Sequence, residues 1–150
     1  MRIRKLELGE RPPMELLLLA DPSEDLIKEY ARIGDCYVAE IDDESIGAYV
    51  LMPSGTGTVE LKNITVAEHL HGRGIGKGLV LDAIRTAKSH GYKRIEVGTG
   101  NSSIGQLALY QKCGFRIERV ERDFFIKNYK EEIFENGIRC IDMIRLSQTL

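Results

Sequence analysis

The chain has 150 residues, 43% of them hydrophobic and 29% charged, and its formal net charge is −2. This length predicts one domain over residues 1–150, with a core large enough to fold without metal or disulfide bonds. The near-neutral charge argues against a dedicated nucleic-acid-binding protein, which usually carries a strong basic excess.

The cysteines and the apolar segments indicate where the protein works. No CxxC pair occurs, so we expect reduced thiols and neither a zinc site nor a disulfide framework. The longest strongly apolar run, Met14–Ala20, is interrupted by Glu15 and is too short to span a bilayer. Pro12-Pro13 stands where a signal peptide would need its apolar region. We therefore expect a cytoplasmic protein. The cysteines are Cys36, Cys113 and Cys140.

The first half of the chain predicts short strands and helices in alternation. Prolines, glycines and acidic residues mark the breaks, since these residue types favour turns and caps. The expected elements are a strand over Arg2–Leu8, a short helix over Met14–Ala20, a helix capped by Asp21-Pro22-Ser23 that runs to about Ile33 and ends at Gly34, a hairpin of Cys36–Ile41 and Ser45–Met52 around Asp42-Asp43-Glu44, and a strand over Thr58–Val66.

The second half contains the clearest helix. Apolar residues recur at helical spacing from Ile75 to Ala87, and His90-Gly91 supplies a C-terminal cation and a stop. The elements expected after it are a strand over Lys93–Val97, a helix from Ser103 to Cys113 with a capping box of Ser103 and Gln106, a strand over Phe115–Glu121, and an Asn136-Gly137 turn that joins Glu132–Glu135 to a long strand over Ile138–Leu146.

Residues 71–78 read HGRGIGKG, with four glycines before and within the start of this helix. A strand, a glycine-rich loop and a helix N-terminus in succession are typical of an anion site, because first-turn N–H groups lack partners and the helix dipole favours negative charge. A dinucleotide fingerprint does not fit, since Lys77 or Leu79 falls in its last glycine position. A Walker A loop does not fit either, because Gly78 follows Lys77 and His71 stands in the first glycine position.

A third pattern fits these residues. The segment His71-Gly72-Arg73-Gly74-Ile75-Gly76 resembles the (Gln/Arg)-x-x-Gly-x-Gly pyrophosphate loop of the GCN5-related N-acetyltransferase (GNAT) superfamily, with His71 in the Gln/Arg position. Asn101 and the later segment ALYQKCGF, residues 108–115, resemble a second hallmark that is commonly LYxKxGF. The two motifs occur in the right order, so the resemblance covers at least Thr58–Phe115.

The resemblance implies an α/β fold with a GNAT-type mixed, mostly antiparallel sheet that is flanked by helices and splayed at the central strands. It implies acetyl-CoA as the co-substrate. In that family a bulged strand exposes backbone groups that hold the pantetheine arm and polarise the acetyl carbonyl, and Ile64 and Val66 are the backbone candidates here. Asn101 is a candidate for the pantetheine amides or, equally, a turn residue. The pyrophosphate is expected on His71, Gly72, Arg73, Gly74, Ile75, Gly76 and Lys77, where Arg73 and Lys77 either contact phosphate or are simply solvated.

Acetyl transfer to an amine needs a base for the ammonium, whose pKa is about 10.4, and an acid for the thiolate, whose parent thiol has a pKa of about 8.5. The resemblance makes Tyr110 the acid, although helical periodicity alone would make it a core aromatic. Glu60 is the first candidate for the base, with an exposed strand carboxylate as the alternative. Glu96 is the second candidate. His69 and His71 are interpreted as loop residues beside the phosphates rather than as proton relays.

The sequence therefore predicts an acetyl-CoA-dependent N-acetyltransferase that acts on an amine acceptor, with no metal, nucleic acid or membrane involved and with a homodimer left open. The alternative is a catalytically idle acyl-CoA-binding sensor or regulatory module. Acidic and aromatic residues after position 117 hint at a cationic acceptor, but charge runs are usually just a solvated face. A polyamine, an amino acid, an antibiotic amine and a protein N-terminus all stay open as acceptors.

Overall fold

The computed structural model describes all 150 residues. Seven strands form one sheet in the order β1-β2-β3-β4-β5-β9-β6, and two short strands form a separate hairpin. The strands are β1 (Arg2–Lys5), β2 (Asp35–Ile41), β3 (Glu44–Pro53), β4 (Thr58–Val66), β5 (Arg94–Gly100), β6 (Arg116–Glu121), β7 (Phe134–Glu135), β8 (Ile138–Arg139) and β9 (Met143–Thr149). The helices are α1 (Met14–Ala20), α2 (Glu24–Ile33), α3 (Ile75–Ser89), α4 (Ile104–Lys112) and α5 (Phe124–Asn128), with a 3-10 turn η1 (Glu68–Leu70).

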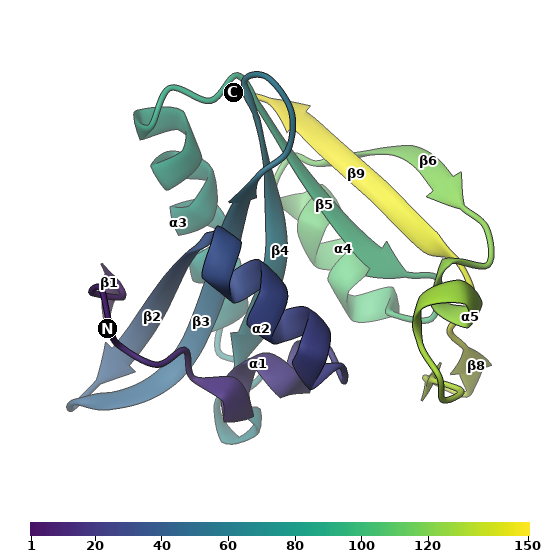
Figure 1. Cartoon of the computed structure of the whole chain (residues 1–150), viewed down its shortest axis with the longest axis horizontal. Helices are drawn as coiled ribbons and strands as arrows, with labels where there is room; N and C mark the ends of the chain where they lie inside the picture. Colours follow the sequence, from purple (N-terminus) through teal and green to yellow (C-terminus); the bar gives the residue numbers. More distant parts are fainter.

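The seven-stranded sheet is antiparallel except for one pair of strands. β4 and β5 run parallel and pair only over Thr58–Leu61 with Arg94–Val97. Beyond these residues the two strands separate. Figure 1 shows them close together near the C-terminus of the chain and apart at the other end, with α4 behind the opening. A mixed, mostly antiparallel sheet that is splayed between its central strands confirms the fold class expected from the sequence.

β4 carries a β-bulge at Lys62. Asn63 lies opposite Val50 of β3, whereas Leu61 lies opposite Leu51, so Lys62 is one extra residue on β4. A bulge bends its strand and increases the local twist. The bulge therefore lies at the point where the pairing between β4 and β5 ends.

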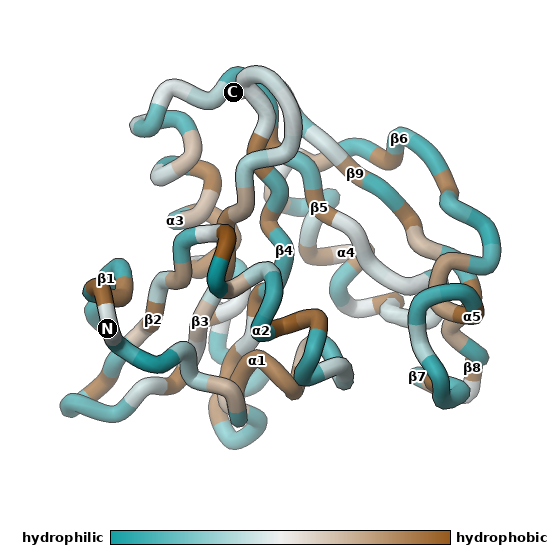
Figure 2. The backbone as a smooth tube through the Cα atoms, viewed as in Figure 1, coloured by the Kyte–Doolittle hydropathy of each residue, from teal (hydrophilic) through white to brown (hydrophobic).

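Two hydrophobic clusters cover the two faces of the sheet. The larger cluster packs the central strands against α3 and α4, with Leu79 and Ile95 fully buried. The smaller one packs β2 and β3 against α1 and α2 around Leu17 and Ile27. Figure 2 shows the hydrophobic stretches of α1 and the central strands. Packing on both faces thus holds in place the strands beside the splay. None of the helices has the length and hydrophobicity that a membrane span requires.

Most of the expected elements are confirmed, several of them to the residue. α1 and β4 have the expected bounds. Asp42 and Asp43 take positive φ in the two-residue turn between β2 and β3, as a tight hairpin requires. Asn136 and Gly137 do the same between β7 and β8. The turn residues in the sequence therefore predicted the positions of both hairpins.

Three expectations are wrong. The first strand ends at Lys5 rather than at Leu8. The expected long strand over Ile138–Leu146 is broken into β8 and β9. The expected capping box at the start of α4 is absent, because Ser103 Oγ donates to Glu135 at 2.7 Å and caps no N–H group. The short helix α5 was not expected at all.

Candidate functional site

Two cavities open into the splay between β4 and β5. The loop cavity has a volume of about 210 Å³ and the splay cavity about 360 Å³. Ile64 and Gln106 line both, so the two cavities meet between β4 and α4. A larger hollow of about 930 Å³ near the N-terminus shares no residue with either. The loop cavity is lined by Ile64, Thr65, Val66, Leu70, His71, Gly72, Gly74, Ile75, Gly76, Gln106 and Leu109. The splay cavity is lined by parts of α1 and its following turn, β4, β5, α4 and residues 125–143.

The backbone N–H groups of Ile64 and Val66 face the splay. Ala67 N–H donates to Ile46 O of β3 at 2.8 Å, and in an antiparallel ladder the direction of these groups alternates along the strand. The N–H groups of Ile64 and Val66 therefore point away from β3, toward β5. Because the pairing with β5 ends before Ile64, these N–H groups have no strand partner.

The glycine loop at residues 71–76 turns through two left-handed backbone positions. Gly72 has a φ of +79° and Gly74 a φ of +78°, a region that L side chains rarely adopt. Gly74 is the N-cap of α3, so the N–H groups of the next three residues lack partners within the helix. A Cβ at Gly74 would meet no protein atom within 4 Å. The space in front of this helix N-terminus is therefore open to an anion.

His71 joins the loop to the end of β4. Its Nε2 lies 2.8 Å from Val66 O, and because a carbonyl oxygen only accepts, Nε2 carries the proton. The C=O group of Val66 is thus hydrogen-bonded to the imidazole ring, while the N–H group of Val66 has no such partner and points into the splay. Arg73 and Lys77 are exposed at the start of α3. Both cations are therefore close to the position that an anion bound at the helix N-terminus would take.

Tyr110 is both a core aromatic and a cavity residue. It is 3% exposed, and its ring packs edge-on against Phe115 with centroids 5.9 Å apart. It lines the splay cavity, and its hydroxyl makes no hydrogen bond within the protein. Burial raises the pKa of Tyr110 well above its ordinary value. The hydroxyl therefore stays protonated at neutral pH and is free to donate.

Neither expected base presents a free carboxylate to the splay. Glu60 is 9% exposed, and its Oε2 accepts a hydrogen bond from Arg145 Nη1 at 3.1 Å, with Lys62 Nζ at 3.6 Å. Glu60 lines neither cavity. Glu96 lies 3.0 Å from Arg94 and also lines neither cavity. This geometry does not support direct proton transfer from an amine in the splay to either glutamate.

Asn101 follows β5 and lies outside both cavities. Its Oδ1 accepts from the N–H groups of Ile141 at 2.7 Å and Asp142 at 2.9 Å, and its Nδ2 donates to Arg139 O at 3.1 Å. These bonds hold residues 140–142 outside the strand ladders and explain the break between β8 and β9. The arrangement matches the turn-residue alternative and does not support a contact with pantetheine.

The three cysteines are buried and form no disulfide, as expected. Burial raises the pKa of the Cys36 thiol to about 12. Burial also raises the pKa of the Cys113 thiol, and the nearby charge of Lys77 opposes this shift. No group of three or more His, Cys, Asp or Glu side chains lies close enough to hold a metal ion.

A chain of polar side chains along the splay cavity was missed by the sequence analysis. Asn63 Nδ2 donates to Tyr30 Oη at 2.9 Å, and Tyr30 Oη donates to Asp21 Oδ2 at 3.0 Å. Tyr129 Oη donates to Asp21 Oδ1 at 2.9 Å from a position 108 residues further along the chain. No local pattern links residues so far apart. The one available signal was Asn63 directly after Lys62, which interrupts the alternation of polar and apolar residues along β4.

Comparison with known proteins agrees with this geometry. The model of the acetyltransferase (GNAT) family matches residues 3–115. The chain is 56% identical over 149 residues to the uncharacterised N-acetyltransferase YvbK of Bacillus subtilis (strain 168), covering 97% of this chain and 96% of that protein. A GNAT family acetyltransferase from Elizabethkingia anophelis, crystallised with acetyl-CoA bound, has a TM-score of 0.97 at 50% identity and covers 99% of this chain and 97% of its own. The IAA acetyltransferase from Bacillus cereus ATCC 14579 has a TM-score of 0.96 at 54% identity and covers 99% of both chains.

The family match spans most of the chain and includes both the glycine loop and Tyr110. A relative that matches nearly the whole fold binds acetyl-CoA. The chain therefore belongs to the acetyltransferase (GNAT) family and is an acetyl-CoA-dependent N-acetyltransferase.

Proposed function

We propose that residues 1–150 form a single catalytic domain that transfers the acetyl group of acetyl-CoA directly to a small amine in the splay cavity. One observation carries this proposal: the same opening joins the glycine loop, the unpaired N–H groups of Ile64 and Val66, and the free hydroxyl of Tyr110. The Bacillus cereus relative is described as an IAA acetyltransferase, which supports acetyl transfer as the activity.

The loop cavity fits the coenzyme. The first-turn N–H groups of α3 would hold the pyrophosphate, with Arg73 and Lys77 adding positive charge beside it. The N–H groups of Ile64 and Val66 would bind the pantetheine amides and the acetyl carbonyl, where a donor stabilises the negative charge that develops on the oxygen. These donors are fixed in advance, because β3 holds β4 along its other edge.

The proposed reaction forms one bond and breaks one. The neutral amine nitrogen attacks the acetyl carbon, the C–N bond forms, and the C–S bond breaks. The nitrogen loses one proton and the sulfur gains one, so the products are the N-acetylated amine and the thiol of coenzyme A. We assign Tyr110 as the donor to the sulfur, since burial keeps its hydroxyl protonated and makes a thiolate at the same place a stronger base. The proton that the nitrogen releases to water in the cavity then restores the hydroxyl of Tyr110.

The proton of the ammonium needs a route other than a free glutamate. Oε2 of Glu60 faces Arg145 and Lys62, and this residue does not line the cavity. We therefore propose that the amine binds in its neutral form or loses its proton to water in the cavity. In this proposal Glu60 holds β4 to β9 instead of accepting a proton.

Acetyl-CoA turnover with a panel of amines tests the proposal, with release of the free thiol as the signal. An enzyme gives amine-dependent thiol release and an N-acetylated product by mass spectrometry. An idle acyl-CoA-binding module, the alternative reading of the same loop, gives coenzyme A binding with no dependence on any amine. The free hydroxyl of Tyr110 favours the enzyme, because binding the coenzyme alone does not require it.

A further inference from the structure

One buried polar side-chain atom of the protein has no partner. This atom is Asn63 Oδ1, on a residue that is 4% exposed and lines the splay cavity. The orientation of the amide is fixed by its Nδ2, which donates to Leu17 O at 3.1 Å, because that carbonyl requires a donor. An unpaired buried acceptor costs about 1–3 kcal/mol. A ligand that brings an N–H group to this atom would remove the cost.

Lys62 places a positive charge beside Asn63. Consecutive side chains of a regular strand point to opposite faces, but the bulge at Lys62 breaks this alternation. Both side chains therefore lie at Tyr30: Lys62 Nζ is 5.9 Å from the centroid of its ring, and Asn63 donates to its hydroxyl. The bulge thus places an ammonium group and an unpaired carbonyl oxygen together on the wall of the splay cavity.

The anionic partner of Lys62 within the protein is Glu60, which Lys62 shares with Arg145. Glu60 Oε2 lies 3.6 Å from its Nζ and accepts a shorter hydrogen bond, at 3.1 Å, from Arg145. The two carboxylates that line the splay cavity already accept hydrogen bonds, Asp21 from Ser23 N, Tyr30 and Tyr129, and Glu135 from Ser102 and Ser103. Lys62 is therefore the cation in this cavity that can take a further anion.

About half of the residues that line the splay cavity are apolar. A volume of about 360 Å³ suits a small molecule. A polyamine would need free carboxylates deep in the cavity, whereas Asp21 already accepts three hydrogen bonds and Glu135 is exposed. The apolar lining residues include Leu18, Leu19, Leu61, Phe125, Ile133 and Met143.

We propose that the acceptor is an amino acid with an apolar side chain. Its carboxylate binds Lys62, its amine donates an N–H to Asn63 Oδ1, and its side chain lies against the apolar wall. This inference rests on the proposed function and names the substrate class of the same site. The amine keeps its lone pair for the acetyl carbon, so the bonds formed and broken are those given above and the product is an N-acetyl amino acid.

Paired substrates isolate the contribution of the carboxylate. L-Leucine and 3-methylbutylamine differ only in that group. We expect Lys62→Gln to lower kcat/KM for L-leucine roughly 10- to 100-fold, the scale of a charge-assisted hydrogen bond, and to change kcat/KM for the amine by less than about three-fold. The basicity of each amine is the same with both enzymes, so it cancels in this comparison. An equal loss for both substrates would overturn the proposal.

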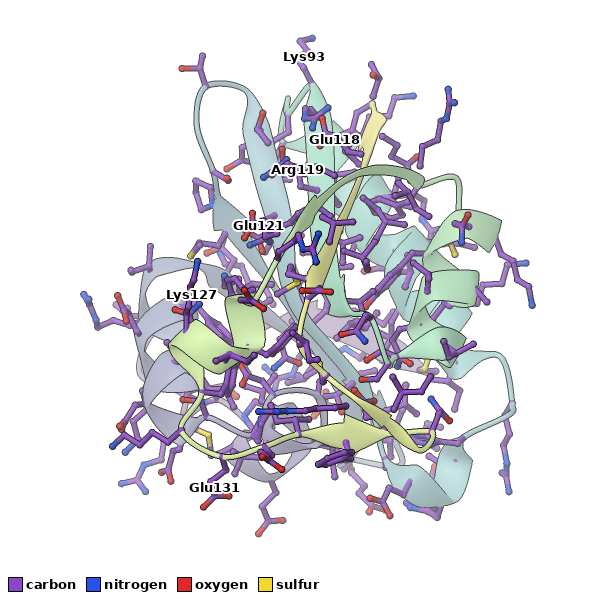
Figure 3. All side chains as sticks on the ribbon, turned by 90° about the vertical axis from the view of Figure 1, so that its right-hand side faces the viewer. Lys93, Glu118, Arg119, Glu121, Lys127 and Glu131 are labelled. Carbon is purple, nitrogen blue, oxygen red and sulfur yellow. The ribbon has the colours of Figure 1, made fainter.

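Lys127→Gln is the matched control. Lys127 lies exposed on α5, as Figure 3 shows, and does not line the splay cavity. Its replacement removes the same charge from the surface and should leave both kcat/KM values unchanged. A loss as large as that of Lys62→Gln would show that general electrostatics, rather than a carboxylate site, governs the preference.

Product binding separates this inference from the proposed function. N-acetyl-L-leucine should raise the melting temperature of the wild type more than that of Lys62→Gln, whereas N-(3-methylbutyl)acetamide should affect both alike. An active enzyme without this difference overturns the amino-acid assignment alone. The difference without turnover of any amine overturns the transfer reaction and keeps the amino-acid site.

Discussion

Arg145 Nη1 lies 3.1 Å from Glu60 Oε2, although the two residues are 85 positions apart in the chain. The guanidinium crosses β5 at Gly98, where a Cβ would come within 2.9 Å of Arg145 Nη1. Arg145 Nε donates to Glu121 of β6 at 3.0 Å. One arginine of β9 therefore joins β4 to β6 across the sheet, next to the place where β4 and β5 separate.

Glu60→Gln keeps the shape of this side chain and removes its charge. We expect the free energy of unfolding to fall by about 1–3 kcal/mol, the scale of a hydrogen bond between charged groups, because Arg145 then keeps only Glu121 as a charged partner and an amide oxygen accepts more weakly than a carboxylate. We expect kcat/KM to rise with pH as the amine loses its proton. The midpoint of this rise should be the same in the variant and the wild type, since Glu60 does not line the splay cavity. Urea unfolding and a pH series measure the two effects. If the rise of kcat/KM with pH were lost in Glu60→Gln but kept in Glu96→Gln, Glu60 would be the general base after all.

Gly74→Ala and Gly91→Ala form a matched pair for the pyrophosphate site. Both glycines have positive φ, and a Cβ at either would meet no protein atom within 4 Å. Each variant should lose roughly 1–2 kcal/mol of stability, because alanine is strained in this backbone region.

Coenzyme A should distinguish the two variants. It should raise the melting temperature of Gly91→Ala as much as that of the wild type, and that of Gly74→Ala much less, because the new methyl group stands where phosphate approaches. Differential scanning fluorimetry measures both shifts. Equal shifts in the two variants would place the pyrophosphate elsewhere.

The fold was predictable where local chemistry decides the backbone. The glycine loop, the two hairpin turns and the bounds of β4 follow from residues that are neighbours in sequence. The short helix α5 could not be anticipated, because it begins after Asp123 at a φ of +63° and has no side-chain cap. Its position depends instead on packing by residues such as Phe125, whose N–H donates to Ile141 O.

The candidate site was predictable on its coenzyme side and not on its acceptor side. The loop and the free N–H groups belong to one strand–loop–helix segment. The surroundings of Glu60, Asn101 and Asn63 include Arg145, Ile141 and Leu17, each 40 or more positions away in the chain. Spacing along the chain suggested Glu60 as a base, but only the fold reveals the arginine that binds it.

Tyr110→Phe tests the assigned acid. We expect turnover to fall roughly 100-fold, the usual scale for acid catalysis, with coenzyme A binding near that of the wild type. Tyr37→Phe is the control, since Tyr37 is 7% exposed, stacks on Tyr49 and lies outside both cavities. Full activity in Tyr110→Phe, with folding confirmed by circular dichroism, would leave this residue as a core aromatic only.

The raised pKa of Tyr110 makes a further prediction for the wild type. Burial keeps the hydroxyl protonated well above the ordinary range for tyrosine. Ionisation of Tyr110 should therefore cause no fall in kcat with rising pH below a pH of about 10, the usual pKa of the side chain. A descending limb near pH 8 that disappears in Tyr110→Phe would contradict the assignment.

Glu118 and Glu121 both contribute to the pH dependence of stability. Both lie along β6 in Figure 3, and hydrogen bonds from Arg94 and Arg145 lower the pKa of Glu118 and Glu121 respectively. A carboxylate with a lowered pKa in the folded state binds fewer protons there than in the unfolded chain. Its contribution to stability is present above the unfolded pKa of about 4.3 and is lost as the pH falls through the folded value.

Glu121→Gln isolates one of these contributions. The variant should be less stable than the wild type at neutral pH, and the two free energies of unfolding should converge as the pH is lowered toward about 3, because Glu121 is then protonated in the wild type as well. Urea unfolding at a series of pH values measures both curves. Glu131→Gln removes an exposed carboxylate without an ion pair, labelled in Figure 3, and should reproduce the wild-type curve. A difference between Glu121→Gln and the wild type that stayed constant across the whole pH range would mean that Glu121 stabilises the sheet by packing rather than by its charge on Arg145.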